Sequence, residues 1–117
     1  MADEIIQLAE RLGKAIAASP QAAALRAARK ELQAQKDVLA TLNEYQQQAQ
    51  KVGMLEAENK PIGVDDKHKL QQLHDKLVSI DVFKKFTAAQ VEYVDLMRRV
   101  TTTLRKNLAD VEGAVEA

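Results

Sequence analysis

Residues that end helices are rare in this sequence, and their positions divide the chain into long segments. Between Pro20 and Pro61 there is one glycine, Gly53, and no further proline. An isolated glycine costs a helix only about 1 kcal/mol, so no residue between these prolines forces a helix to end. Aromatic residues make up only 3% of the chain, and the regularly spaced turn signals of a β-sandwich are missing. The sequence therefore predicts an all-α fold in a single helical domain, residues 1–117.

Apolar spacing and capping signals predict four helical segments in the order short, long, short, long. The first is expected at about residues 3–18, where the larger apolar residues fall on one helical face. Ser19-Pro20 is typical of a new helix start, with serine as the N-cap and proline at the first helical position. The second helix is therefore expected to run from Pro20 to about Ala57.

The second half of the chain repeats the order of a short and then a long helix. A loop is expected at about residues 59–64, which contain a proline and a glycine. The third helix is expected at about residues 65–79, with Asp65 or Asp66 as its N-cap. The fourth is expected at about residues 82–112, and the glycine that follows is placed to end it.

The two long segments carry larger apolar residues at alternating steps of three and four, which is the spacing of a coiled coil. We expect them to pack as an antiparallel, coiled-coil-like hairpin. A helix from Pro20 to Ala57 would be about 57 Å long. A compact domain of this size has a radius of gyration of only about 13 Å. Either the helices bend or break, or a second chain covers them, and we expect a homodimer because identical amphipathic faces commonly self-associate.

The residues expected at protein interfaces are larger apolar side chains of these two segments. They are Leu32, Leu39, Leu42, Tyr45, Phe86, Tyr93, Met97, Val100 and Leu104.

No group of residues matches a catalytic or metal-binding motif. The two histidines, His68 and His74, are six residues apart and would point about 120° away from each other on a helix. Metal-binding pairs on one helical face are three or four residues apart. The absence of cysteine excludes disulfides, thiolate metal sites and cysteine nucleophiles. We therefore predict no catalytic residue, metal or cofactor and no enzymatic activity, and a metal-dependent helical enzyme remains a third hypothesis.

The charge balance argues against a dedicated nucleic-acid binder. Lys and Arg together number 17, as do Asp and Glu, so the formal net charge is zero. Nucleic-acid binders usually carry a basic excess. The exception is a basic strip formed by Arg98, Arg99, Arg105 and Lys106, which could contact an anionic partner. RNA binding through this strip is the alternative function, although we expect a solvated face and no direct contact with nucleic acid.

The sequence also bears on the cellular compartment. No stretch of apolar residues is long enough to cross a bilayer, and the first charged residues, Asp3 and Glu4, are acidic rather than basic. We therefore expect a cytoplasmic protein that does not contact a membrane.

Three groups of residues carry a resemblance to a known family. The opening has Leu8-Ala9, Leu12, Ile16, Ser19-Pro20, Leu25 and Ala28; the second segment has Leu39, Leu42, Tyr45 and Gln47; the second half has Leu70, Leu73, Leu77, Ile80, Phe86, Ala89, Gln90, Leu96, Met97 and Val100. Over residues 4–108 this layout resembles the YlbF/YmcA family of small helical bacterial regulators.

The resemblance implies an all-α fold with long helices, together with dimers or hetero-complexes with family paralogues. It also implies a regulator that acts through protein contacts, as in competence, biofilm formation and sporulation. Studied members form a complex linked to RNase Y and messenger RNA maturation. That complex holds iron–sulfur clusters through cysteines, so cluster binding does not carry over to this cysteine-free chain. The implied function is that of a non-enzymatic regulatory adaptor.

Overall fold

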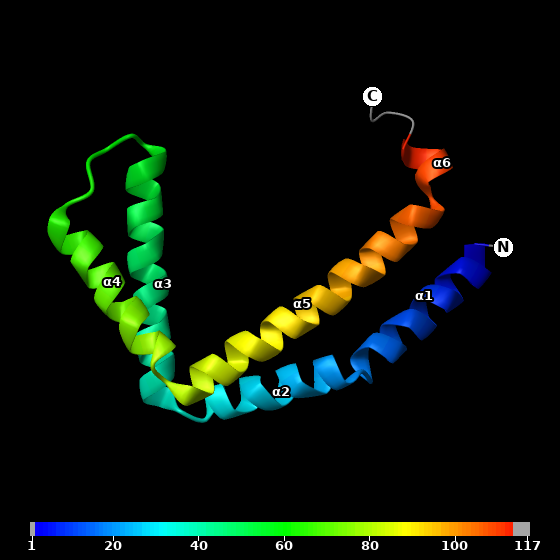
Figure 1. The fold of residues 1–117 in the computed structure, drawn as a ribbon, viewed down its shortest axis with the longest axis horizontal. Coiled ribbons are helices and arrows are strands. Elements are labelled where there is room, and N and C mark those ends of the chain that lie inside the picture. The colour runs from blue at the N-terminus through cyan, green and yellow to red at the C-terminus, as the bar shows by residue number, and fades with distance from the viewer. Residues whose placement is uncertain (1, 114–117) are drawn as a thin grey trace. The chain divides into compact units, whose positions relative to one another are not determined.

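The protein, described here by a computed structural model for residues 2–113, consists of helices joined by short connections (Figure 1). Within this range there is no strand, so the predicted all-α class is confirmed. The helices number six rather than the predicted four. In chain order they are α1 (Ala2–Ala17), α2 (Pro20–Gln33), α3 (Lys36–Ala57), α4 (Val64–Val78), α5 (Asp81–Asn107) and α6 (Ala109–Glu112).

The predicted continuity of the second helix is wrong, because the chain leaves the helical conformation between α2 and α3. Gln35 is extended there, with φ −107° and ψ 94°. No glycine or proline causes this break, whereas the helix continues through Gly53. Local helix propensity therefore does not mark the position of the break, and the helix that follows it packs along α4.

The predicted fourth helix is also divided, at Leu108, into α5 and α6. Leu108 has φ −108° and ψ 7° and is the N-cap of α6, and Gly113 is the C-cap. Residues 101–112 are all exposed. None of the residues in this stretch is therefore buried by other described residues.

The chain divides into two compact units. The first unit consists of residues 1–26 and 88–117, and so contains α1, the start of α2, most of α5, and α6. The second unit is residues 27–87 and contains the end of α2, α3, α4 and the start of α5.

The second unit is built around the packing of α3 on α4, the most extensive helix contact among residues 2–113. Its buried apolar side chains include Val38 and Val52 of α3 and Leu73 and Leu77 of α4. The expected hairpin of two long helices is therefore modified, because the α3 half of the predicted long helix pairs with the third predicted helix.

A left-handed residue ends α3 and turns the chain toward α4. Asn59 has φ 57°, a conformation that asparagine tolerates better than most residues. The Lys60 N–H donates to the Leu55 carbonyl at 2.8 Å, and the Asn59 N–H donates to the Glu56 carbonyl at 3.1 Å. This pair of bonds is the Schellman arrangement, which satisfies carbonyls that the end of a helix leaves free.

The junction between α1 and α2 forms as predicted, with Ser19 as the cap and Pro20 as the first residue of α2. The Ser19 hydroxyl accepts a hydrogen bond from the Ala22 N–H at 3.1 Å and donates one to the Ile16 carbonyl at 2.6 Å. The Arg26 guanidinium donates to the Ala17 carbonyl at 2.9 Å. The last turn of α1 is thereby bound to the start of α2.

Candidate protein-interaction surface

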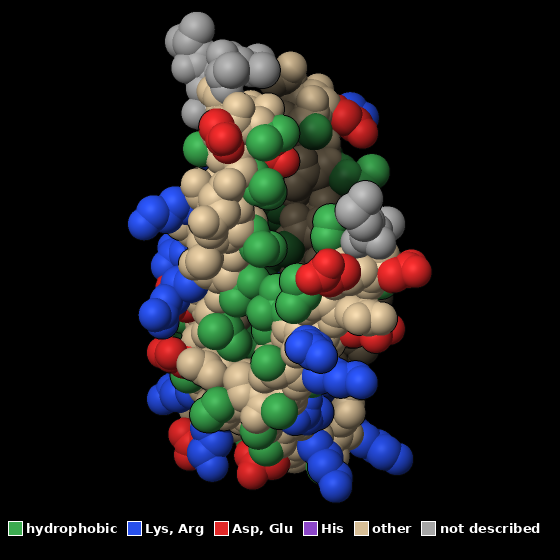
Figure 2. All heavy atoms as spheres, turned by 90° about the vertical axis from the view of Figure 1, so that its right-hand side faces the viewer, with side chains coloured by type: hydrophobic (Ala, Val, Ile, Leu, Met, Phe, Trp, Pro, Cys, Tyr) green, Lys and Arg blue, Asp and Glu red, His purple; other side chains and the backbone are tan. Residues whose placement is uncertain are grey.

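A groove in the first unit runs between α1 and α5, which lie side by side (Figure 1). The two helices do not approach each other as closely as α3 and α4 do. Figure 2 faces the end of the molecule that holds the start of α1, and shows a band of hydrophobic side chains bordered by charged ones. The groove is lined by Leu12 from α1 and by Leu96, Arg99, Val100, Thr103 and Leu104 from α5.

The apolar face of α1 is largely uncovered within the chain. Ile5, Leu8 and Leu12 are spaced to share one helical face, and they are 68%, 56% and 36% exposed. On the opposite wall of the groove, Leu104 is 52% exposed. Apolar side chains gathered in this way are typical of a site that binds another protein.

The residues predicted for protein interfaces fall into three groups. Leu32 is only 3% exposed, so its side chain belongs to the packing of the chain itself. Val100 and Leu104 line the groove. The other six are half-buried on α3 or α5: Leu39, Leu42, Tyr45, Phe86, Tyr93 and Met97.

The contribution of α1 to this surface was not predicted. The apolar residues of the first helix were expected to share one face, but none of them was expected at an interface. A short helix usually covers such a face inside its own chain, so apolar spacing alone did not distinguish Leu8 and Leu12 from core residues. The signal present in the sequence was the Ser19-Pro20 boundary, which separates this helix from the long one that follows.

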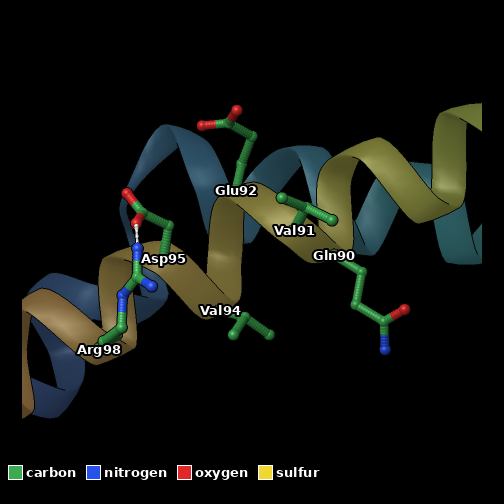
Figure 3. A pocket seen from close by; sticks show the side chains of 6 residues that line it. All are labelled: Gln90, Val91, Glu92, Val94, Asp95 and Arg98. Atoms are coloured by element: carbon green, nitrogen blue, oxygen red, sulfur yellow. Dashed lines mark hydrogen bonds and ion pairs between the residues drawn. The ribbon is translucent and has the colours of Figure 1, made fainter.

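The basic strip predicted on the last long helix is interrupted by its neighbours. Arg98, whose side chain is 74% exposed, forms an ion pair with Asp95 one turn earlier on the same helix (Figure 3). Arg99 lies on the groove instead. The four cations Arg98, Arg99, Arg105 and Lys106 therefore do not form one uninterrupted cationic face.

A second apolar patch lies on α5 beside this ion pair. Figure 3 shows its lining side chains, with Val91 and Val94 as the apolar members. They are 60% and 57% exposed. Neither valine lines the groove toward α1, so the two surfaces of α5 can be altered independently.

The second unit offers polar groups but no metal site in the part of the chain that the structure describes. Tyr45 and His74 lie side by side across α3 and α4, with their ring centroids 6.2 Å apart. His74 is also 3.6 Å from the Asp75 carboxylate, and its side chain is 52% exposed. Among residues 2–113 no three His, Asp or Glu side chains are grouped to hold a metal ion.

No helix in residues 2–113 has the length and apolar character needed to cross a membrane.

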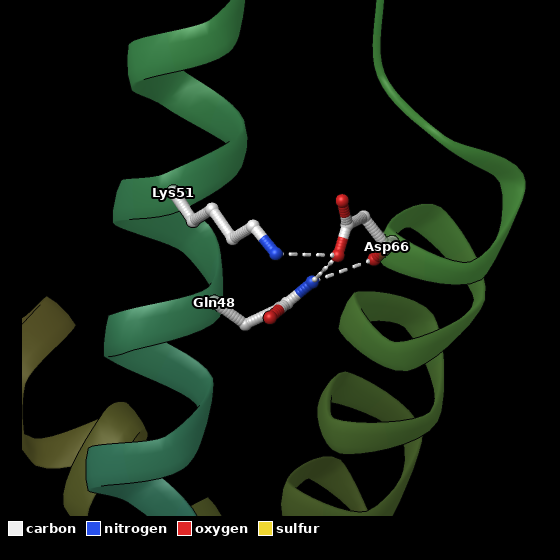
Figure 4. Close-up of polar contacts among 3 residues, drawn as sticks. All are labelled: Gln48, Lys51 and Asp66. Atoms are coloured by element: carbon white, nitrogen blue, oxygen red, sulfur yellow. Dashed lines mark hydrogen bonds and ion pairs between the residues drawn. The ribbon is translucent and has the colours of Figure 1, made fainter.

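A polar contact joins α3 to α4 through Asp66 (Figure 4). The Gln48 amide donates to the Asp66 carbonyl at 3.0 Å and to its carboxylate at 3.2 Å. The Lys51 ammonium lies 3.1 Å from the same carboxylate. The predicted capping role of Asp65 or Asp66 is therefore wrong, because Gly63 is the N-cap of α4 and no side chain caps it.

These contacts make the stability of the hairpin depend on acidity. The hydrogen bond from Gln48, followed by that from Lys51, lowers the pKa of Asp66 below its ordinary value of 3.8. The ionised carboxylate thus stabilises the fold above pH 3.8, and this contribution is lost as the pH falls through the lower folded pKa.

We expect Asp66→Asn to remove this contribution. The free energy of unfolding of this variant, measured by denaturant titration, should therefore fall less steeply than that of the wild type as the pH is lowered in the acidic range. Asp65→Asn is the matched control and should keep the wild-type dependence of the unfolding free energy on pH. If the two variants and the wild type showed the same dependence, the contacts of Asp66 would not be its source.

The chain matches the model of a family described as "Control of competence regulator ComK, YlbF/YmcA" over residues 5–109. No curated protein and no solved structure matches it. The matched range includes most of α1 and all of α5, and so both walls of the groove. The resemblance seen in the sequence is confirmed, and the chain belongs to the YlbF/YmcA family, which is described by its control of the competence regulator ComK.

Proposed function

We propose that this chain is a non-enzymatic regulatory adaptor that binds other protein chains through its helices. Membership of a family described by control of a competence regulator supports the regulatory role. The observation that carries the adaptor role is the groove between α1 and α5, whose apolar walls are open to solvent. Covering a large aliphatic side chain contributes about 1.5–3 kcal/mol. Several such side chains are exposed on the groove walls, and covering them would offset part of the entropy that is lost on association.

The form of the groove favours a helix as the occupying element. An amphipathic helix binds a groove through apolar residues three and four positions apart. The walls present apolar residues at the same spacing, such as Val100 and Leu104 on α5. The partners we propose are a second copy of this chain and paralogues of the same family, which would bring similar amphipathic helices.

The interrupted basic strip makes direct RNA binding the weaker alternative. Arg98 is paired with Asp95, so its charge is partly offset before any phosphate approaches. A link to RNase Y-dependent messenger RNA maturation, as the family resemblance implies, would on this proposal run through protein contacts.

Affinity capture with the tagged full-length chain, from lysate of its own cells with and without ribonuclease, tests the proposal. We expect a family paralogue or an RNA-decay enzyme to be recovered equally in both samples. Recovery that disappears with ribonuclease would favour RNA binding through the strip. Recovery of the bait alone would indicate a self-contained homo-oligomer and would contradict the adaptor role.

A further inference from the structure

Helix α1 is almost uncovered by the other residues that the structure describes. Of residues 3–17, only Ile16 is half-buried, and all the others are exposed. Helix α1 has 16 residues, and most of the stability of such a helix in a protein comes from packing of its apolar face, because helix nucleation is costly. The packing that would stabilise α1 is not supplied by the described part of the chain.

The two ends of α1 differ in how firmly they are held. Its last turn is bound to α2 through Ser19 and Arg26. Its first turns contain Ile5 and Leu8, which are more than half exposed. Opening of the helix would therefore begin at its start and be arrested near Ile16.

The charges at the ends of the groove indicate what could cover it. The first turn of α1 carries Asp3 and Glu4, and the last turn of α5 carries Arg105 and Lys106. Because α1 and α5 run in opposite directions in this unit, these turns lie toward the same end (Figure 1). If a second copy is related by a two-fold axis along the groove, α1 of each copy faces α5 of the other.

Such an arrangement places the acidic turn of each copy against the basic turn of its partner. It also covers the apolar walls of both grooves, as a self-complementary two-fold interface requires. The formal net charge of zero means that no overall repulsion opposes the pairing. A second copy therefore satisfies both the apolar and the charged groups of the groove.

We propose that α1 is a conditional helix, which folds when the groove of a second copy covers it and opens when the two copies separate. The inference rests on the proposed role of the groove as an assembly surface. Folding of α1 and dimerisation are then one coupled equilibrium. The protein concentration therefore determines the fraction of chains in which α1 is folded and the groove has both of its walls. The α3–α4 hairpin, whose core lies within its own unit, stays folded in both states.

Hydrogen exchange read by mass spectrometry at several protein concentrations tests the coupling. On dilution from high to low micromolar concentration, we expect the protection of residues 5–13 to fall by at least about tenfold. The protection of α3 should not change. Leu8→Asp should leave α1 unprotected at every concentration, whereas Val94→Asp, at an equally exposed site outside the groove, should behave as wild type.

Paramagnetic relaxation identifies the occupant of the groove. Because the chain has no cysteine, Thr102→Cys carries one spin label, at an exposed position of α5 that does not line the groove. Mixing this chain with isotope-labelled, unmodified chain should broaden the α1 amide signals of the latter. Reduction of the spin label should restore those signals.

Two results would overturn the inference. One is concentration-independent protection of α1 in a protein that sediments as a monomer. The other is an absence of intermolecular broadening in α1 at concentrations where the chain sediments as a dimer. Both measurements use the purified chain alone, so they are distinct from the capture experiment. A dimer with a conditional α1 that recovers no other protein would contradict the adaptor role but not this inference.

Discussion

Leu77→Ala is expected to lower the free energy of unfolding by about 2–5 kcal/mol. Leu77 is 1% exposed and has the most fully buried large side chain among the described residues. It lies on α4, the helix that packs on α3. Truncation removes three buried carbon atoms and leaves a space that rigid helices fill only in part. Because a small domain is stable by only about 5–15 kcal/mol, this one change would remove a large share of the total.

Urea titration followed by far-ultraviolet circular dichroism measures the effect. The control is Val78→Ala, at the next residue of α4, where the side chain is 41% exposed. Its expected effect is within about 0.5–1 kcal/mol, because exposed positions away from special features change stability little. If both substitutions changed the midpoint equally, the α3–α4 contact would not be the core that the structure indicates.

Leu104→Asp is expected to weaken partner binding by about 100-fold or more, whereas Val94→Asp should leave it near the wild-type level. Leu104 lines the groove and Val94 does not, yet both lie on α5 and their exposed fractions are 52% and 57%. A covered leucine contributes about 1.5–3 kcal/mol, and an unpaired carboxylate in its place adds a desolvation cost. A combined loss of about 3 kcal/mol corresponds to roughly 100-fold in affinity.

The measurement is the amount of the captured partner recovered with each tagged variant. Hydrogen exchange of each purified variant should first show unchanged protection of α3, so that lost binding is not mistaken for lost folding. Equal recovery with Leu104→Asp and wild type would show that the groove is not the binding surface. Equal losses with both variants would indicate a general effect of added negative charge on α5.

The sequence predicted those parts of the fold that depend on local chemistry. The Ser19-Pro20 start of α2 formed as expected because a serine side chain and a proline ring act within one helical turn. The loop near Pro61 was likewise found. These features need only neighbouring residues, so a sequence pattern contains all the information that they require.

The parts that were missed depend on residues far apart in the chain. The break at Gln35 has no glycine or proline to mark it, and the helix that follows it packs on α4, whose residues are far away in the sequence. Asp66 has the sequence context of a helix cap, but its partners Gln48 and Lys51 lie on another helix. Val100 and Leu104, which were predicted as interface residues, line the groove. The exposure of α1 was not predicted, because it depends on what the described part of the chain leaves uncovered.

The Gln48–Asp66 contact has a further consequence for how α3 and α4 are aligned. Gln48 is 6% exposed, and its amide bonds to both the main chain and the side chain of one residue. Sliding α4 by one turn, about 5.4 Å, would carry both acceptors away and leave a buried amide unpaired. Apolar contacts between two helices tolerate such a slide far better, because they have no fixed direction. This glutamine therefore selects a single register for the hairpin, and the penalty on every other register is a source of structural specificity as well as of stability.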